Sequence, residues 1–178
     1  DTTLTFDDEQ GQTWHHHSVS WTEDTDAADG LAAFTEPVDS VGAPAYFVLP
    51  TAAEQAFNEA HWDDGDCEEP CGARYAVWPG NPLWDEQNQR AILLYGLIYA
   101  EPGDFNFEGR GSSVATWSSI EAPVERPIID ANATHPDLIW DETEPGIGAA
   151  AAIDGDYLYA FACEQEGLGR PCFLVRAP

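Results

Sequence analysis

The chain has 178 residues, of which 43% are apolar and seven are tryptophan, enough for a domain with a buried core. It carries 33 acidic residues against six arginines and no lysine, which gives a formal net charge of −27. Such a charge repels phosphate backbones and anionic lipid surfaces, so the composition excludes nucleic acid as a partner. No segment has the ~20 apolar residues of a transmembrane helix, so we expect no membrane insertion.

Three explanations fit the acidic composition. The plainest is a solvated surface that stays soluble by self-repulsion in a salt-rich or extracellular setting. Calcium is the second, because Asp and Glu supply the hard oxygen ligands that this ion prefers. A basic partner is the third. We take the solvated surface as the leading interpretation.

The four cysteines form two close pairs, Cys67 with Cys71 and Cys163 with Cys172. An even number of cysteines with local pairing predicts two disulfides and an oxidising compartment. Zinc is the alternative, but it would require Cys-x-x-Cys spacing or neighbouring histidines, and neither pair has them. The pattern therefore indicates a protein that is secreted or located in a bacterial envelope or periplasm.

Strand-forming residues dominate the first 50 positions. Residues 13–21 are rich in β-formers, include three consecutive histidines and are followed by an acidic turn, so we expect a strand there. A second short strand is expected over Tyr46–Leu49, where Pro50 stops it.

One helix is expected, beginning after residue 50. Thr51 suits the N-cap, and Glu54 three residues later completes a capping box, which predicts a helix over 51–57. An acidic loop over 63–71 follows, closed by the first cysteine pair. Residues 51–72 are therefore interpreted as an insertion into a β fold.

Strands return in the second half of the chain. Residues 91–100 form a long apolar run, whose β-branched and aromatic content, central glycine and following Pro102-Gly103 favour a strand buried on both faces. Further strands are expected over 74–78, 112–117, 156–163 and 172–176.

The predicted strands show self-similarity. Leu94-Tyr95-Gly96 resembles Leu158-Tyr159-Ala160, and 17–22 resembles 112–117. The spacing of the first pair suits the ~40 to 60 residues of a propeller blade, so a β-propeller is favoured over a β-sandwich, which also has short strands. Residues 1–178 would form a single propeller-like domain of about three blades. Because closed propellers need at least about four, we expect a partial or processed chain, completed by further sequence or by another chain.

Several segments carry a family resemblance. Residues 91–100 with 104–117, and residues 146–159 with 170–176, resemble blades of an uncharacterised bacterial family of five-bladed β-propellers that includes endo-D-arabinanase glycoside hydrolases. The opening Asp1-Thr2 resembles the end of the sequence motif that marks the first blade in that family. The resemblance implies a five-bladed, arabinanase-like propeller that needs no cofactor.

The resemblance also implies where catalytic carboxylates lie. Hydrolysis with inversion needs two carboxyl groups ~6.5 to 9.5 Å apart, and in a propeller these come from inner strands near the axis. Asp1 is the candidate general base, and Glu144, ahead of an Ala-rich strand, is the candidate acid. The alternative is that both are ordinary solvated carboxylates.

Four residues are candidates for sugar binding. His15 and His17 share one face of their strand, and Arg74 with Trp78 combines a guanidinium with an aromatic ring, which suits a sugar. The alternatives are an ordinary strand surface for the histidines and a structural ion pair for Arg74. No metal site is expected, although calcium in the 63–71 loop is an alternative to a solvated loop that lacks EF-hand spacing.

The sequence thus predicts a secreted, glycoside-hydrolase-like propeller that acts on arabinan or a similar polysaccharide. The alternative is a non-catalytic extracellular or envelope module that binds glycan or assembles with another chain.

Overall fold

The computed structural model of the chain describes residues 2–3, 14–63, 65–119, 122–164 and 169–177. Strands dominate this part of the chain, and α1 (Ala52–Ala60) is the single helix within it, which confirms the all-β prediction with one short helix. The chain divides into two compact units, residues 1–49 and residues 50–178, and each is described by itself.

The first unit has little regular structure. Strand β1 (Thr2–Thr3) pairs antiparallel with β2 (Trp14–His15), and isolated bridges join Trp21 to Thr35 and Val38 to Pro44. Only the beginning of the strand expected over 13–21 is therefore present.

The prediction of a strand over Tyr46–Leu49 is wrong, because none of these residues belongs to a strand. The backbone N–H of Val48 donates to His17 Nε2 at 2.9 Å. Tyr46 stacks on His15 with ring centroids 4.4 Å apart. Side-chain contacts thus hold this segment where a strand ladder was expected.

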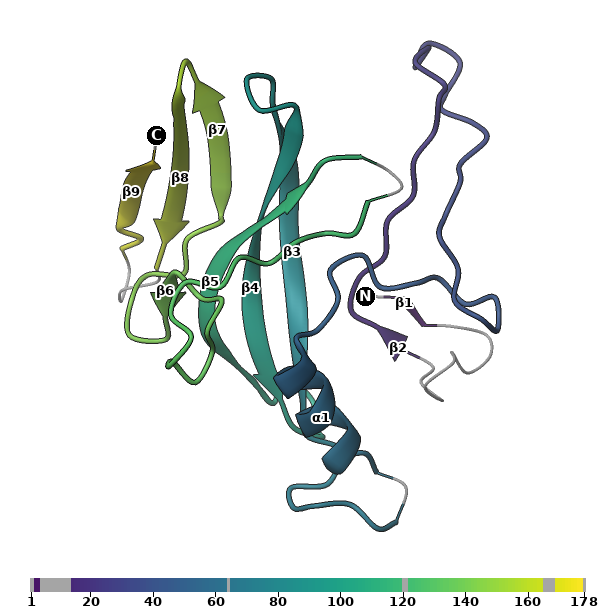
Figure 1. The fold of residues 1–178 in the computed structure, drawn as a ribbon, viewed down its shortest axis with the longest axis vertical. Coiled ribbons are helices and arrows are strands. Elements are labelled where there is room, and N and C mark those ends of the chain that lie inside the picture. The colour runs from purple at the N-terminus through teal and green to yellow at the C-terminus, as the bar shows by residue number, and fades with distance from the viewer. Residues whose placement is uncertain (1, 4–13, 64, 120–121, 165–168, 178) are drawn as a thin grey trace. The chain divides into compact units, whose positions relative to one another are not determined.

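The second unit contains two antiparallel sheets whose strands follow chain order (Figure 1). The four-stranded sheet consists of β3 (Arg74–Asp85), β4 (Arg90–Ala100), β5 (Phe107–Trp117) and β6 (Trp140–Asp141). The three-stranded sheet consists of β7 (Ala150–Asp154), β8 (Tyr157–Cys163) and β9 (Cys172–Ala177). Each sheet is thus a simple up-and-down meander.

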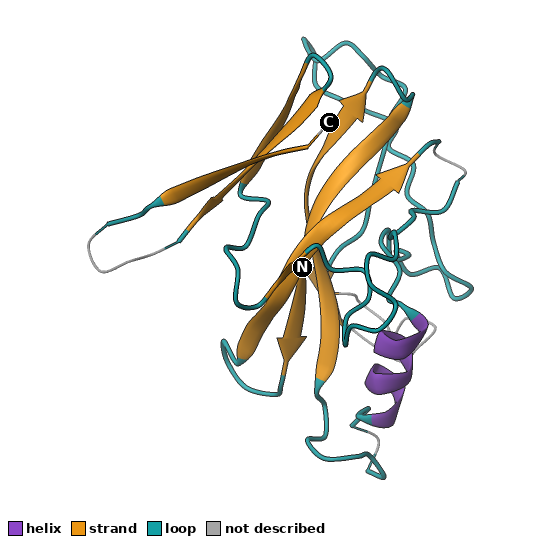
Figure 2. Ribbon diagram, turned by 60° about the vertical axis from the view of Figure 1, so that its left-hand side comes forward, coloured by secondary structure: helices purple, strands orange, loops and turns teal. Residues whose placement is uncertain are grey.

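Strand β4 is buried on both faces, as its apolar composition predicts. Alternate residues of a strand point to opposite faces. Leu94 therefore faces the three-stranded sheet, whereas Tyr95 contacts Asp137 and Tyr99 contacts Phe57 of α1 on the other face. Figure 2 shows α1 beside the four-stranded sheet.

The two sheets of the second unit are joined by an apolar cluster. Leu94 from β4, Ile147 and the small residues Ala160 and Ala162 from β8 are its buried members. Partly buried residues pack around them: Val114, Trp140, Ala151 and Val175. The backbones of the two sheets come nearest to each other between β3 and β7.

Helix α1 begins as the sequence predicts. The Glu54 N–H donates to Thr51 Oγ1 at 3.2 Å, and the Thr51 N–H donates to Glu54 Oε2 at 2.8 Å, which is a complete capping box. Phe57 packs against Tyr75 of β3, with ring centroids 4.8 Å apart. No helix among the described residues has the length and apolar character needed to cross a bilayer.

A buried ionic network lies on the helix side of the four-stranded sheet. The Arg126 guanidinium donates to both carboxylate oxygens of Glu54, at 2.6 and 2.8 Å, and to Asp137 Oδ2 at 2.6 Å. The Tyr95 hydroxyl also donates to Asp137. These charged side chains are at most 6% exposed. Arg126 therefore ties α1, β4 and the 126–137 segment together.

Both predicted disulfides are present, Cys67–Cys71 and Cys163–Cys172. The second joins directly opposite residues of β8 and β9. Disulfides of this kind are typical of oxidising compartments.

Removing the Cys163–Cys172 disulfide is expected to destabilise the β8–β9 hairpin. For a sequence separation of nine residues, the loss of loop closure corresponds to about 2 to 3 kcal/mol. The measurement is thermal unfolding of the Cys163→Ala/Cys172→Ala double variant against the parent chain. The Cys67→Ala/Cys71→Ala variant is the comparison, with a smaller expected loss of about 2 kcal/mol because its loop is shorter. An unchanged melting temperature in the first variant would contradict the expectation.

Candidate functional site

A cleft of about 430 Å³ opens within the second unit, beside the four-stranded sheet. Strands β3, β4 and β5, the turn after β6 and the segment leading to β7 form its walls. The residues that line it are Trp78, Pro79, Gly80, Leu94, Tyr95, Gly96, Ile98, Gly109, Gly111, Ser112, Asp141, Glu142, Glu144, Gly146, Ile147 and Gly148.

Glycines form much of the cleft floor. Gly96 and Gly109 come from adjacent strands, and they leave the sheet backbone uncovered where other residues would place side chains. A Cβ atom added to Gly109 or Gly146 would meet no atom within 4 Å. The hollow therefore exists because this part of the sheet lacks side chains.

A β-bulge adjoins the cleft. The pairing of β4 with β5 shifts between Leu97 and Ile98, so that Arg110 is an extra residue in β5. A bulge redirects side chains locally. The Arg110 guanidinium lies 4.8 Å from the centre of the Tyr99 ring and does not line the cleft.

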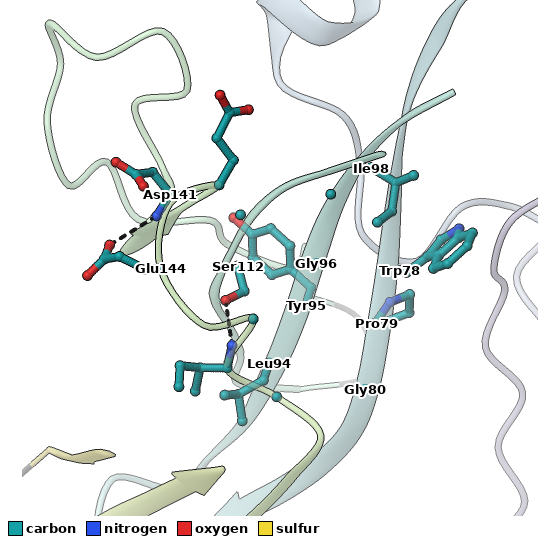
Figure 3. A pocket seen from close by; sticks show the side chains of 16 residues that line it. Trp78, Pro79, Gly80, Leu94, Tyr95, Gly96, Ile98, Ser112, Asp141 and Glu144 are labelled. Atoms are coloured by element: carbon teal, nitrogen blue, oxygen red, sulfur yellow. Dashed lines mark hydrogen bonds between the residues drawn. The ribbon is translucent and has the colours of Figure 1, made fainter. Parts of the chain in front are cut away.

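Acidic residues of the segment 141–144 line one wall of the cleft. In Figure 3 the side chains of Asp141 and Glu144 point away from Trp78. The Asp141 N–H donates to Glu144 Oε2 at 3.1 Å. The Thr143 hydroxyl and N–H donate to Asp141 Oδ1 at 2.6 and 2.8 Å, and these hydrogen bonds hold the pKa of Asp141 below its usual value. Asp141 is therefore ionised at neutral pH.

An aromatic ring forms the opposite wall. Trp78 lies opposite Gly96 in the β3–β4 ladder, and its side chain is 39% exposed. Phe107, at the beginning of β5, extends the aromatic surface, with ring centroids 5.0 Å apart. Figure 3 shows Asp141 and Glu144 on one side and Trp78 on the other, with Gly96 and Ser112 between them.

Two of the residues singled out in the sequence, Glu144 and Trp78, meet in this cleft. Arg74 lies on the same strand face as Trp78, but four residues away, ~13 Å along β3, and it does not line the cleft. Asp1 lies outside the described residues. The role of Glu144 as an acid stays a prediction.

The structure places His15 and His17 in the interior of the first unit. Their exposed fractions are 2% and 8%. Besides the contacts with Tyr46 and Val48, His17 Nδ1 lies 2.6 Å from His16 Nδ1. These rings hold the first unit together, and their role in sugar binding stays a prediction.

No group of three or more His, Cys, Asp or Glu side chains within the described residues is arranged to hold a metal ion. Residue 64 of the acidic 63–71 loop is not among the described residues. Calcium in that loop stays a prediction.

Sequence reasoning missed Asp141, Glu142 and Phe107. A signal for the first two was present, because the acidic run 141–144 stands directly before the turn-forming Pro145-Gly146. Nothing in the sequence indicated that Trp78 lies across from that run, because the two segments are 63 residues apart and meet only through the pairing of the intervening strands.

The cleft thus offers hydrogen-bond acceptors on one side and an exposed indole on the other. Hydroxyl-rich ligands with an apolar face suit this combination. Comparisons with protein-family models, with curated proteins and with solved structures gave no match for this chain.

Proposed function

We propose that the chain is the glycan-binding part of a secreted or envelope-located protein, and that the cleft is its sugar site. The observation that carries this proposal is a cleft with the exposed Trp78 ring on one side, the acidic residues Asp141 and Glu144 on the other, and glycines between them. A sugar ring presents C–H groups that pack on an indole, and its hydroxyls donate to carboxylates. The two disulfides support an oxidising compartment.

Glycoside hydrolysis of an arabinan-like polysaccharide is the second candidate. It is favoured by Glu144, which lies in the cleft as the candidate acid. Hydrolysis, however, needs two carboxyl groups that flank the sugar bond. The described carboxylates of the cleft all come from the single turn over 141–144, so the geometry supports binding better than catalysis.

The same proposal includes the architecture: the two sheets of the second unit are two blades of a β-propeller. Two consecutive antiparallel meanders, β3–β6 and β7–β9, pack face to face through Leu94, Ala160 and Ala162. Adjacent blades of a propeller pack in this way. The arrangement supports two blades of a five-bladed ring, in which other sequence or another chain supplies the remaining blades.

Replacing Trp78 by alanine is expected to weaken glycan binding about tenfold, because stacking on an aromatic ring contributes about 1.4 kcal/mol, a factor of ten in affinity. The measurement is calorimetric titration with a panel of soluble arabinan, glucan and amino-sugar oligosaccharides. Trp84→Ala is the matched control, since Trp84 belongs to the same strand and is 53% exposed but does not line the cleft. Equal losses in both variants, or no binding to any glycan, would contradict the proposal.

The hydrolytic candidate is separated from the binding one by assaying reducing-end release from the same panel. Release that disappears in Glu144→Gln but persists in Glu86→Gln establishes hydrolysis. Glu86 is exposed in the β3–β4 turn and lies outside the cleft. Binding without release supports the non-catalytic module.

A further inference from the structure

A second cavity, of about 310 Å³, lies within the second unit between the two sheets. The β3–β4 turn and the β7–β8 turn lie at the same end of these sheets (Figure 1), and residues of both turns line the cavity. It shares no lining residue with the cleft described above. It is therefore a separate candidate site, and what it binds does not depend on the proposed function.

The strand register explains where this cavity forms. Ile92 and Leu94 lie on the same face of β4, because alternate residues of a strand share a face. Leu94 belongs to the same buried cluster as Ala160 of β8. Two residues nearer the turns, Ile92 and Leu158 line the cavity instead. The facing surfaces of the two sheets thus pack together in the middle and separate towards the turns.

Apolar side chains from both sheets form the cavity walls. Ile92, Val114 and Trp140 come from the four-stranded sheet, and Ile153 and Leu158 come from the three-stranded sheet. An apolar cavity of about 150 Å³ accommodates benzene, so a cavity of twice that volume suits an apolar body of roughly twelve non-hydrogen atoms. The indole of Trp140 adds an aromatic surface against which a ring can pack.

A guanidinium with unused donors also lines the cavity. The Arg90 Nε donates to Asp85 Oδ2 at 3.4 Å, and no described residue accepts a hydrogen bond from its two terminal nitrogens. The Asp85 carboxylate has further donors, because the backbone N–H and the side-chain amide of Asn88 donate to it at 3.1 and 2.8 Å. The terminal nitrogens of Arg90 are therefore available to an acceptor on a ligand.

We infer that this cavity binds a small apolar carboxylate, an aromatic or fatty acid whose body lies between the sheets and whose head group pairs with Arg90. A guanidinium presents a planar fork of donors that matches the two oxygens of a carboxylate. No other described residue that lines the cavity is Arg, Lys or His. Asp156, the second acid of the lining, is exposed in the β7–β8 turn and belongs to the other sheet.

The net charge of −27 opposes the binding of anions in general. At 0.15 M salt, however, the Debye length is about 8 Å, so most of this repulsion is screened at the surface. The contact with Arg90 is short-ranged and is screened less. A preference for an acid over its neutral analogue would therefore report on Arg90 and not on the charge of the whole chain.

The test compares 2-naphthoate with 2-naphthamide by calorimetric titration at 0.15 M salt. The two probes have nearly the same shape, but only the acid carries a negative charge. We expect the acid to bind at least tenfold tighter. Decanoate and decanamide form a second pair, which distinguishes a fatty chain from an aromatic body, and preference for the acid in either pair supports the inference. Equal or tighter binding of the amide in both pairs, or no binding of any probe, overturns it.

Two variants locate the binding. Arg90→Gln should lower the preference for the acid at least tenfold, whereas Arg74→Gln should leave it unchanged, since Arg74 lies at the other end of the β3–β4 ladder and does not line the cavity. Ala177→Phe places a ring in the cavity and should weaken binding of the acid at least tenfold. Ala152→Phe is its control, because Ala152 is exposed on the other face of the three-stranded sheet.

The variants also state what would contradict the inference. Equal losses of preference in Arg90→Gln and Arg74→Gln would assign the preference to net charge and overturn it. Unchanged binding in Ala177→Phe would show that the acid binds elsewhere, which overturns it as well. None of the four substituted residues lines the cleft. Glycan binding and its dependence on Trp78 are therefore decided separately from this result.

Discussion

Replacing Arg126 by methionine is expected to lower the free energy of unfolding of the second unit by about 3 to 5 kcal/mol. The guanidinium is 6% exposed and lies between Glu54 and Asp137, whose side chains are 4% and 1% exposed. Methionine fills a similar volume but leaves two buried carboxylates without a counter-charge. Most of the lost stability is therefore the cost of keeping two carboxylates buried without a positively charged partner.

The electrostatics of this network agree with that expectation. Burial alone lowers the pKa of Arg126, but the hydrogen bonds to Glu54 and the neighbouring negative charges raise it above its usual value. Burial raises the pKa of Tyr95, which remains a protonated donor to Asp137. Urea unfolding followed by tryptophan fluorescence measures the effect.

The control for Arg126→Met is Arg90→Met. Arg90 is 43% exposed and lies 3.4 Å from Asp85, and surface pairs of this kind contribute less than about 1 kcal/mol. A loss below 1 kcal/mol in Arg126→Met as well would show that the network does not hold α1 against the sheet.

The second large effect is expected for Gly111→Ala, about 4 kcal/mol of destabilisation. Gly111 has a φ of +132°, a conformation that residues with a side chain rarely adopt. An added Cβ would collide with the Trp140 carbonyl oxygen and lie 3.0 Å from Asp141 Cα. The short strand β6, and with it the carboxylate turn, would have to move away from β5.

Gly109→Ala is the matched control for Gly111→Ala. It is the same substitution two residues earlier in β5, where the added methyl meets no atom within 4 Å. A change within about 0.5 kcal/mol is expected there. If both variants lose the same stability, the close approach of β6 to Gly111 is not what makes this glycine necessary.

Local signals in the sequence predicted the regular elements of the second unit well. The capping box at Thr51 and Glu54 needs only two residues three positions apart, and it gave the helix start. The apolar run over 91–100 and its flanking turn residues gave β4. Leu94-Tyr95-Gly96 and Leu158-Tyr159-Ala160 both lie in inner strands of antiparallel sheets, β4 and β8.

Predictions that depended on long-range contacts fared worse. Tyr46–Leu49 has strand-forming residues, but its backbone partner is a histidine side chain 31 residues away. The likeness of 17–22 to 112–117 does not extend to structure, because only the second segment is a strand. In the cleft, Glu144 and Trp78 were each singled out in the sequence, but their juxtaposition depends on the order of the strands between them.

The glycine floor of the cleft also bears on how this protein diversifies. Gly109 and Gly146 have room for a side chain, whereas Gly111 has none. On the proposed glycan-binding function, single substitutions at 109 and 146 would change ligand preference without loss of the fold, while position 111 stays fixed. Inherited changes in specificity are thus expected at a few floor positions, and the same positions are the natural starting points for a library that selects new ligands.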